Sequence, residues 1–181
     1  MKMDKCRICS STNYKDIRKV KSPYFDAFYT LYECSDCKCR FFDARENEDI
    51  SLTSLYESFA DKNNQMLDAK FTPTPYWKGQ VDILNKYSKN GIKNVLDIGC
   101  RTGDFLMHFD SKVEKHGVEL SEQYSKICVE RGITTYTDFI EKINFDSKFD
   151  VVSAYALLEH LEFPDVVLKS MKKIVADDGL I

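Results

Sequence analysis

The sequence lacks any long hydrophobic run. Nowhere in its 181 residues do about 18 apolar residues follow one another, the length at which a transmembrane helix becomes a candidate. The first residues, MKMDKCRICSS, have no apolar core of the kind that signal peptides carry. We therefore expect no contact with a membrane and a reducing, cytoplasmic location.

A strong excess of charge of one sign is also missing. The 26 lysines and arginines stand against 29 aspartates and glutamates, for a formal net charge of −3. Binding of a large RNA needs clustered basic side chains, so this balance argues against a nucleic-acid partner. A small basic cluster is interpreted as a solvated face; it consists of Lys15, Arg18, Lys19 and Lys21.

Internal repeats and low-complexity tracts are absent as well. The composition and the hydrophobic pattern change twice along the chain. Residues 1–45 hold most of the cysteines, residues 46–91 are polar and mixed, and residues 92–181 read as a regular domain. The composition, 43% hydrophobic and 30% charged, is ordinary for a globular protein. We predict a small N-terminal module, a helical linker and an α/β domain with these boundaries.

Cysteine is abundant, with seven residues of which five lie before residue 40. Cys6-x-x-Cys9 and Cys34-x-x-Cys37 form two pairs of the spacing that binds one metal ion through two thiolates. Four thiolates leave no open position, so we predict a structural zinc in a ribbon-like module. Free thiols or one redox pair are the alternative, and Cys39 is a spare thiol that could replace Cys37.

The last ninety residues alternate short apolar runs with helical patterns, which favours a parallel, Rossmann-like sheet. We expect strands at 93–99, 116–120, 133–138 and 149–156. Helices are expected at 102–110, 121–132 and 163–178, the last with Gly179 past its end, and another precedes them at 76–91. The final GLI would then open a fifth strand.

VLDIGCRTGDF, residues 95–105, joins the first strand to a helix. Gly99 and Gly103 permit tight turning and close approach of a ligand. The order D-x-G-x-R-x-G differs from the phosphate-binding G-x-G-x-x-G pattern. Asp97 and Asp104 flank the loop and would repel a pyrophosphate, so a cofactor with a positive centre fits better.

Two further carboxylates follow at strand ends. Glu119 ends the second strand, 20 residues beyond Gly99, where an acidic side chain can accept hydrogen bonds from ribose hydroxyls. Asp138 ends the third and is placed to accept from an adenine amino group. Taken one at a time, each is equally well explained as a solvated carboxylate.

These pieces resemble class I S-adenosylmethionine-dependent methyltransferases. The resemblance rests on VLDIGCRTGDF, GVELSE, the TD of residues 137–138 and the stretch from Phe149 to Ile181. CRICSS and YECSDCKCRFFD are similar to the zinc-binding region that precedes this domain in sugar C-methyltransferases, and SLTSLYESF resembles the linker that follows it.

The resemblance implies a set of cofactor contacts. Gly99 and Gly103 would approach the methionine part of S-adenosylmethionine, together with Asp97 and Cys100 of the same segment. Glu119 would bind the ribose, and Asp138 with Phe139 would border the adenine. Arg101 departs from the family, which usually has a small residue there; its side chain would point to solvent, pair with Asp104, or meet the methionine carboxylate.

The second departure is length, because the family's sheet has seven strands and this chain reaches four and the start of a fifth. We expect either a truncated chain or an exposed sheet edge that pairs with a second copy. His160 is the candidate general base, with packing at a strand–helix junction as the commoner role for such a histidine. No catalytic residue is otherwise assigned.

Methyl transfer from S-adenosylmethionine to a small molecule, for example a nucleotide-linked sugar, is the leading hypothesis. Two alternatives stay open. One is a non-catalytic binding module with a degenerate methyltransferase fold or an attached zinc ribbon. The other is an RNA base methyltransferase that begins with a zinc module.

Overall fold

The computed structural model describes residues 5–22, 26–42, 71, 73–161 and 163–181. The chain divides into two compact units, with the division between Asp68 and Ala69. We call the described residues before the division the cysteine unit and those after it the sheet unit. The predicted linker SLTSLYESF lies outside the described residues, and the predicted zone boundaries stay predictions.

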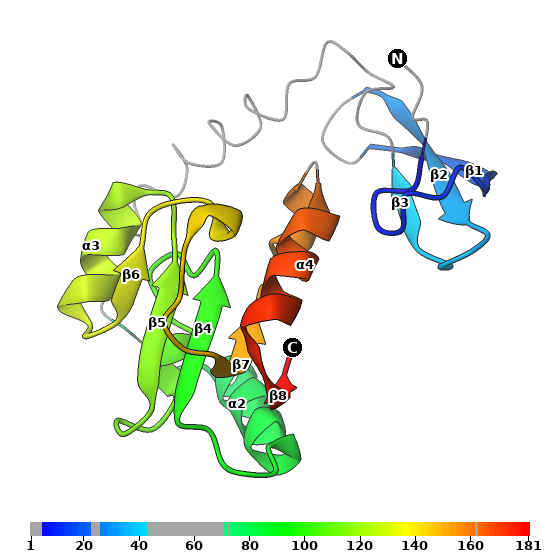
Figure 1. Ribbon diagram of the computed structural model, residues 1–181. Helices are drawn as coiled ribbons and strands as arrows, with labels where there is room; N and C mark the ends of the chain where they lie inside the picture. The colour runs from blue at the N-terminus through cyan, green and yellow to red at the C-terminus, as the bar shows by residue number, and fades with distance from the viewer. Residues whose placement is uncertain (1–4, 23–25, 43–70, 72, 162) are drawn as a thin grey trace. The chain divides into compact units, whose positions relative to one another are not determined.

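The cysteine unit contains a small antiparallel sheet (Figure 1). Strand β1 covers Tyr14–Lys21, β2 covers Phe28–Cys34 and β3 covers Arg40–Phe42, in the order β1-β2-β3. Cys34 pairs with Tyr14 at the end of the β1–β2 ladder. The second cysteine pair therefore begins where β2 ends.

The sheet unit is built on five parallel strands (Figure 1). They are β4 (Asn94–Ile98), β5 (Glu114–Val118), β6 (Thr134–Tyr136), β7 (Phe149–Ser153) and β8 (Val175–Leu180). Their order, β6-β5-β4-β7-β8, is that of a Rossmann sheet, in which the strand order reverses beside the first strand. This arrangement confirms the predicted fold class.

Among the residues that the structure describes, three α-helices accompany these strands: α2 (Pro75–Tyr87), α3 (Glu122–Glu130) and α4 (Pro164–Ile174). The short 3₁₀ turns are η3 (Leu106–His108), η4 (Ile140–Lys142) and η5 (Leu158–His160). Ser121 caps α3 as predicted, because its side chain accepts the N–H of Tyr124. No helix among the described residues is both long and apolar enough to cross a membrane.

The expectation of a helix that continues to residue 178, with Gly179 past its end, is wrong. Helix α4 ends at Ile174, and Val175–Leu180 forms β8, a fifth strand that pairs with β7. A Cβ on Gly179 would lie 3.0 Å from the carbonyl oxygens of Phe149 and Asp150, so glycine permits the close approach of the two strands. The predicted helix at 102–110 is likewise reduced to the turn η3.

Two apolar clusters fill the two faces of the sheet. Neighbouring residues of a strand point to opposite faces, so Val95 joins one cluster and Leu96 the other. Helices α2 and α3 pack on the first face through Val81 and Cys128. Helix α4 packs on the second through Val167 and Met171 among others.

The edges of the described five-stranded sheet are β6 and β8. Pairing of an edge with a second copy of the chain stays a prediction. The carboxyl ends of β4, β5 and β7 lie at one edge of the parallel sheet, and the loops there form the candidate site (Figure 1).

Candidate functional site

The glycine-rich loop follows β4 at the carboxyl edge of the sheet. Gly99 and Gly103 have φ angles of 74° and 75°, in the left-handed region. A Cβ on Gly103 would lie 2.3 Å from Cδ1 of Ile133, so a side chain at this position would force the buried Ile133 to move. The two predicted glycines are thus required by the backbone and, at Gly103, by packing.

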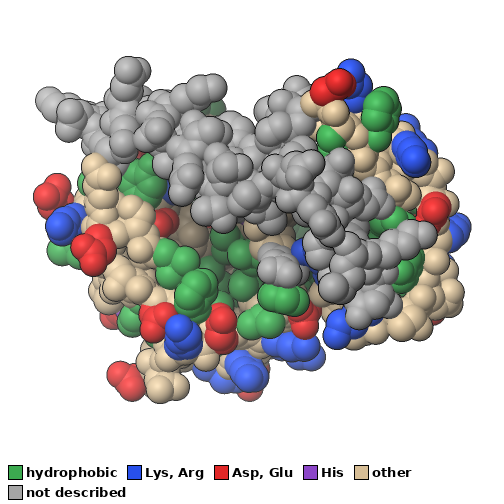
Figure 2. All heavy atoms as spheres, turned by 90° about the horizontal axis from the view of Figure 1, so that it is seen from above, with side chains coloured by type: hydrophobic (Ala, Val, Ile, Leu, Met, Phe, Trp, Pro, Cys, Tyr) green, Lys and Arg blue, Asp and Glu red, His purple; other side chains and the backbone are tan. Residues whose placement is uncertain are grey.

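Strand β4 points upward in Figure 1, so Figure 2 looks down on the edge at which the parallel strands end. Hydrophobic side chains gather towards the middle of this view, with acidic and basic side chains around them (Figure 2). Such a mixture of apolar surface and a few polar groups is typical of small-molecule sites.

Glu119 follows β5 and fixes the loop to α3. Its Oε2 accepts the backbone N–H of Arg101 at 2.9 Å, and its Oε1 accepts that of Ser121 at 2.8 Å. Each carboxylate oxygen keeps a further lone pair for a ligand hydroxyl. Glu119 therefore orders the loop while its carboxylate stays at the carboxyl edge of the sheet.

Asp97 lies inside the sheet near the end of β4 and is only 4% exposed. Burial raises the pKa of its carboxyl to about 7, and the charge of Glu119 adds to the effect. The hydroxyl of Ser153, at the end of β7, opposes this by donating to Oδ1 at 2.7 Å. Ser153 was not predicted; its only signal is its place at the carboxyl end of a strand.

Arg101 is a non-glycine residue with a left-handed φ of 49°. Its guanidinium lies over the ring of Tyr124 in α3, 5.4 Å from the centroid, and the residue is exposed. Its carbonyl oxygen accepts the thiol proton of Cys128 at 3.1 Å. Of the three orientations left open by the sequence, the structure shows an exposed side chain stacked on α3.

Cys100 has its side chain in the core rather than at the open side of the loop. It is 6% exposed, and its Sγ lies 3.8 Å from Sγ of Cys128. A Cβ on Gly117 would lie 2.4 Å from this sulfur, so the glycine in β5 makes room for it. The predicted contact with a cofactor is therefore restricted to the backbone of Cys100.

Asp138 and Phe139 are exposed beyond the end of β6. Asp138 accepts the N–H of Phe139 at 2.7 Å and pairs with Lys142 at 3.5 Å. Phe139 keeps 52% of its surface exposed, and Leu120, which follows Glu119, keeps 54%. Leu120 was missed by the sequence reasoning, because an apolar residue beside a strand end has no distinctive spacing.

His160 ends η5 and is exposed, and its backbone N–H bonds to the carbonyl of Leu157. Its role as a base stays a prediction. Leu157 lies close to the loop, since its Cδ1 would be 3.2 Å from a Cβ on Gly99. Tyr155 packs with its ring centroid 4.8 Å from that of Phe105, and burial raises the pKa of its hydroxyl.

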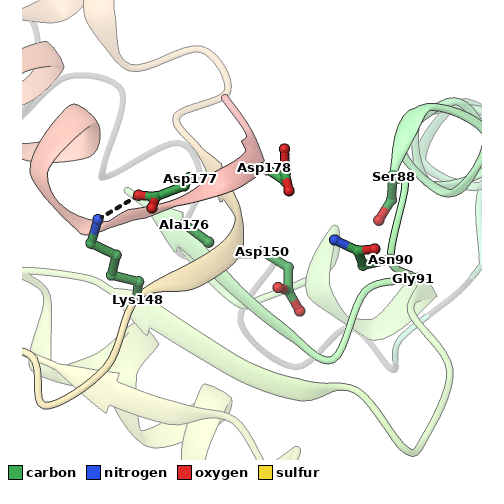
Figure 3. Close-up of a pocket in the computed structure, with 8 residues that line it drawn as sticks. All are labelled: Ser88, Asn90, Gly91, Lys148, Asp150, Ala176, Asp177 and Asp178. Carbon is green, nitrogen blue, oxygen red and sulfur yellow. Dashed lines mark hydrogen bonds and ion pairs between the residues drawn. The ribbon is translucent and has the colours of Figure 1, made fainter.

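A hollow of about 440 Å³ lies away from this site, near the amino ends of β4 and β7 (Figure 3). Asp150 in this hollow accepts the backbone N–H of Lys93 at 2.7 Å, and Lys148 pairs with Asp177 at 3.0 Å. These groups join β4, β7 and β8 to one another. We therefore assign the hollow a structural role.

The four cysteines predicted as metal ligands come together in the cysteine unit. All four sulfurs of Cys6, Cys9, Cys34 and Cys37 lie within 4.8 Å of one another. Cys6 and Cys37 are 3.7 Å apart and Cys9 and Cys34 are 3.5 Å apart. Bonds of about 2.3 Å to a tetrahedral zinc place sulfurs about 3.8 Å apart, so the cluster fits such an ion.

The two cysteine pairs adopt the same backbone turn. Ser10 N–H bonds to the carbonyl of Cys6, and Lys38 N–H bonds to that of Cys34. Ser10 and Lys38 have φ angles of 60° and 62°. Cys39 lies outside the four-sulfur group, with its Sγ 3.6 Å from the carbonyl oxygen of Arg40.

Comparison with known proteins places the sheet unit in a family. Residues 53–181 match the family described as "Methyltransferase domain". Ubiquinone biosynthesis O-methyltransferase of Pasteurella multocida is 27% identical over 112 residues, covering 51% of this chain and 46% of that protein. The protein of the same description from Actinobacillus pleuropneumoniae is 23% identical over 154 residues, which cover 72% of this chain and 64% of that protein.

The fold agrees with this match. The plantazolicin methyltransferase BpumL, solved with a triazolic desmethylPZN analog and SAH, superposes with a TM-score of 0.53. It is 16% identical, and the match covers 66% of this chain and 51% of that one. The chain spans between about a third and two thirds of the length of the curated relatives it matches. It belongs to the methyltransferase domain family and has the class I methyltransferase fold.

Proposed function

We propose that this chain binds S-adenosylmethionine at the carboxyl edge of its sheet and transfers the methyl group to a small-molecule acceptor. The observation that carries the proposal is Glu119, whose carboxylate binds the loop at Arg101 and the start of α3 at Ser121. A ribose placed there would meet a carboxylate already fixed in position, which lowers the ordering cost of binding.

The charges of the site suit a cation better than a phosphate. Asp97, Glu119 and Asp138 follow or end three neighbouring strands, and no lysine or arginine pairs with Asp97 or Glu119 in the contacts of the described residues. A sulfonium and an ammonium group would lower the electrostatic energy of these carboxylates. A pyrophosphate would raise it.

Exposed apolar side chains support an adenine site. Leu120 and Phe139 are more than half exposed, and they follow Glu119 and Asp138 at the ends of adjacent strands β5 and β6. Apolar groups flanking polar acceptors are suited to a flat heteroaromatic ring with an amino group. This arrangement agrees with the predicted role of Asp138 and Phe139.

In the reaction, bound S-adenosylmethionine would supply an electrophilic methyl group. The residues of this chain orient the cofactor and exclude water, through the glycine loop, Glu119 and Leu157. His160 is the candidate to remove a proton from the acceptor, because an imidazole can act as a general base. Tyr155, behind the loop near Phe105, is a candidate for the wall of the acceptor site.

The proposed acceptor is a small molecule, and the more specific candidate is a nucleotide-linked sugar. The matched proteins include enzymes of ubiquinone biosynthesis and a plantazolicin methyltransferase, which supports a small-molecule acceptor. The N-terminal resemblance to sugar C-methyltransferases supports the sugar. A zinc bound by Cys6, Cys9, Cys34 and Cys37 would stabilise the cysteine unit without taking part in the reaction.

Calorimetric titration with S-adenosylhomocysteine, the demethylated cofactor, tests the proposal. We expect micromolar binding to the 181-residue chain and a loss of about tenfold or more in Glu119→Ala, because charge-assisted hydrogen bonds are lost. Glu130→Ala, an exposed glutamate at the end of α3, is the matched control and should bind normally. Absence of binding to the folded wild-type chain would refute the proposal.

A further inference from the structure

An arginine at the carboxyl end of α3 bonds to the second half of the glycine loop. Arg131, the C-cap residue of α3, donates from Nη1 to the carbonyl oxygen of Thr102 at 2.7 Å. The same nitrogen donates to Oδ1 of Asp104 at 2.5 Å. The Arg131 side chain is 15% exposed, and its guanidinium lies 5.8 Å from the ring centroid of Phe71.

These contacts fix the second half of the loop. The Thr102 carbonyl belongs to the peptide that leads into Gly103, whose φ of 75° has few alternatives once Ile133 packs against it. A charged donor with little exposure makes a stronger hydrogen bond than a solvated one. Arg131 therefore restricts the rotation of the Thr102–Gly103 peptide.

Other groups hold the rest of the loop independently of Arg131. Glu119 binds the N–H of Arg101 at 2.9 Å. Nδ1 of His108 lies 2.8 Å from the carbonyl oxygen of Asp104. Nε2 of the same ring accepts the backbone N–H of Thr74 at 2.9 Å. Because Nε2 accepts, Nδ1 carries the proton and donates it to Asp104. Loss of Arg131 should thus loosen one peptide and leave the loop's ends attached.

We propose that Arg131 is a positioning residue for the cofactor loop. It acts through Thr102 on Gly103, which by the resemblance to methyltransferases would lie beside the methionine part of the cofactor, so this inference rests on the proposed function. The hydrogen bonds of Arg131 described above go to Thr102 and Asp104 of the loop, whereas the proposed adenosine side of the site is built on Glu119 and Asp138. Loss of Arg131 should therefore weaken binding of the methionine part of the cofactor more than binding of the adenosine part.

Lysine cannot fully replace this residue. The guanidinium is planar and presents several N–H donors, so one group reaches a carbonyl and a carboxylate while its face covers Phe71. An ammonium on a flexible stem keeps the charge but fixes the geometry less well. Arg131→Lys should recover part of the effect of Arg131→Ala.

The test compares S-adenosylhomocysteine with 5′-methylthioadenosine, which lacks the amino-acid part. Both are titrated into the 181-residue chain, Arg131→Ala and Arg131→Lys. We expect Arg131→Ala to weaken S-adenosylhomocysteine about tenfold and 5′-methylthioadenosine less than about twofold. Lys169→Ala, which removes the Lys169–Asp165 ion pair of α4, is the matched control and should change neither affinity.

Two results would overturn the inference: equal losses for both ligands, or an unchanged affinity for S-adenosylhomocysteine in folded Arg131→Ala. If Arg131→Ala does not fold, the same comparison with Arg131→Lys decides, because that variant keeps the charge. A wild-type chain that binds no S-adenosylhomocysteine would remove the proposed function and this role with it. If the wild-type chain and both Arg131 variants bind S-adenosylhomocysteine with the same affinity, the role of Arg131 is refuted and the proposed function is not.

Discussion

The cysteine unit and the sheet unit differ in the interactions that stabilise their folds. Among the residues that the structure describes, the buried apolar side chains of the cysteine unit are Cys6, Tyr32 and Cys34. The sheet unit has an apolar cluster on each face of its strands. A unit with so small a core cannot offset the entropy of folding by burial alone, so its stability should depend on the sulfur cluster.

Residues with left-handed backbone occur in both units, and their surroundings differ from one position to the next. In the cysteine unit, Ser10 and Lys38 adopt positive φ at the surface, where their side chains have room. In the sheet unit, Gly103 adopts a similar φ against Ile133, where a Cβ would collide. Arg101 has positive φ and is exposed, so it resembles the first case. At Gly103 the packing against Ile133 therefore adds to the preference for glycine that a left-handed φ already gives.

Metal removal should have the largest effect and should act on one unit alone. Chelation or Cys34→Ser is expected to unfold the cysteine unit, because structural zinc contributes about 10 kcal/mol or more to folding in small domains. The sheet unit should keep its thermal transition in calorimetry. Metal analysis should find about one zinc per chain, and Cys39→Ser should leave that content unchanged; a metal-free, folded unit would contradict the prediction.

Truncation of a core residue should destabilise the sheet unit and leave the cysteine unit unaffected. Leu96 is fully buried in β4, so Leu96→Ala should lower the free energy of unfolding of the sheet unit by about 2–5 kcal/mol. The cause is lost apolar burial together with the cavity that remains. Chemical denaturation followed by circular dichroism measures the change, and zinc content should stay the same. A parallel loss of metal would show that the units do not fold independently.

The buried carboxyl of Asp97 should make the sheet unit sensitive to pH. Its pKa is about 7 in the folded state against an ordinary value of 3.8, so the folded state binds the proton more tightly. The stabilising contribution is present below about pH 4 and is lost as the pH rises to about 7, by a few kcal/mol at most. Asp97→Asn should flatten this part of the profile of unfolding free energy; an unchanged slope would contradict the assignment.

Arg101→Gly should have the smallest effect. Glycine removes the cost of left-handed φ, about 1 kcal/mol, but it also removes the stacking of Arg101 on Tyr124. The net change in unfolding free energy should stay within about 1 kcal/mol, as measured by denaturation. Binding of S-adenosylhomocysteine should be retained, and a large gain in affinity would mean that the arginine obstructs the site.

Much of the fold was predictable because its signals are local. The strands near 93–99 and 149–156 are apolar runs closed by polar residues, and Ser121 is an ordinary helix cap. A fifth strand was expected to open only at the final GLI, and its start at Val175 was missed because Asp177 and Asp178 disfavour a strand and pairing with β7 supplies its hydrogen bonds. The contacts of Arg131 were also unpredictable, since they join residues more than 25 positions apart.

The sequence by itself determined the cysteine pairs, the glycine loop and the carboxylates at strand ends, because spacing and strand periodicity are properties of the chain. Only the tertiary structure decided how these parts are used. It turned the Cys100 side chain into the core, stacked Arg101 on α3, buried Asp97 beside Ser153 and brought Arg131 to the loop. Each of these depends on elements packed from distant segments, whose mutual positions no local pattern encodes.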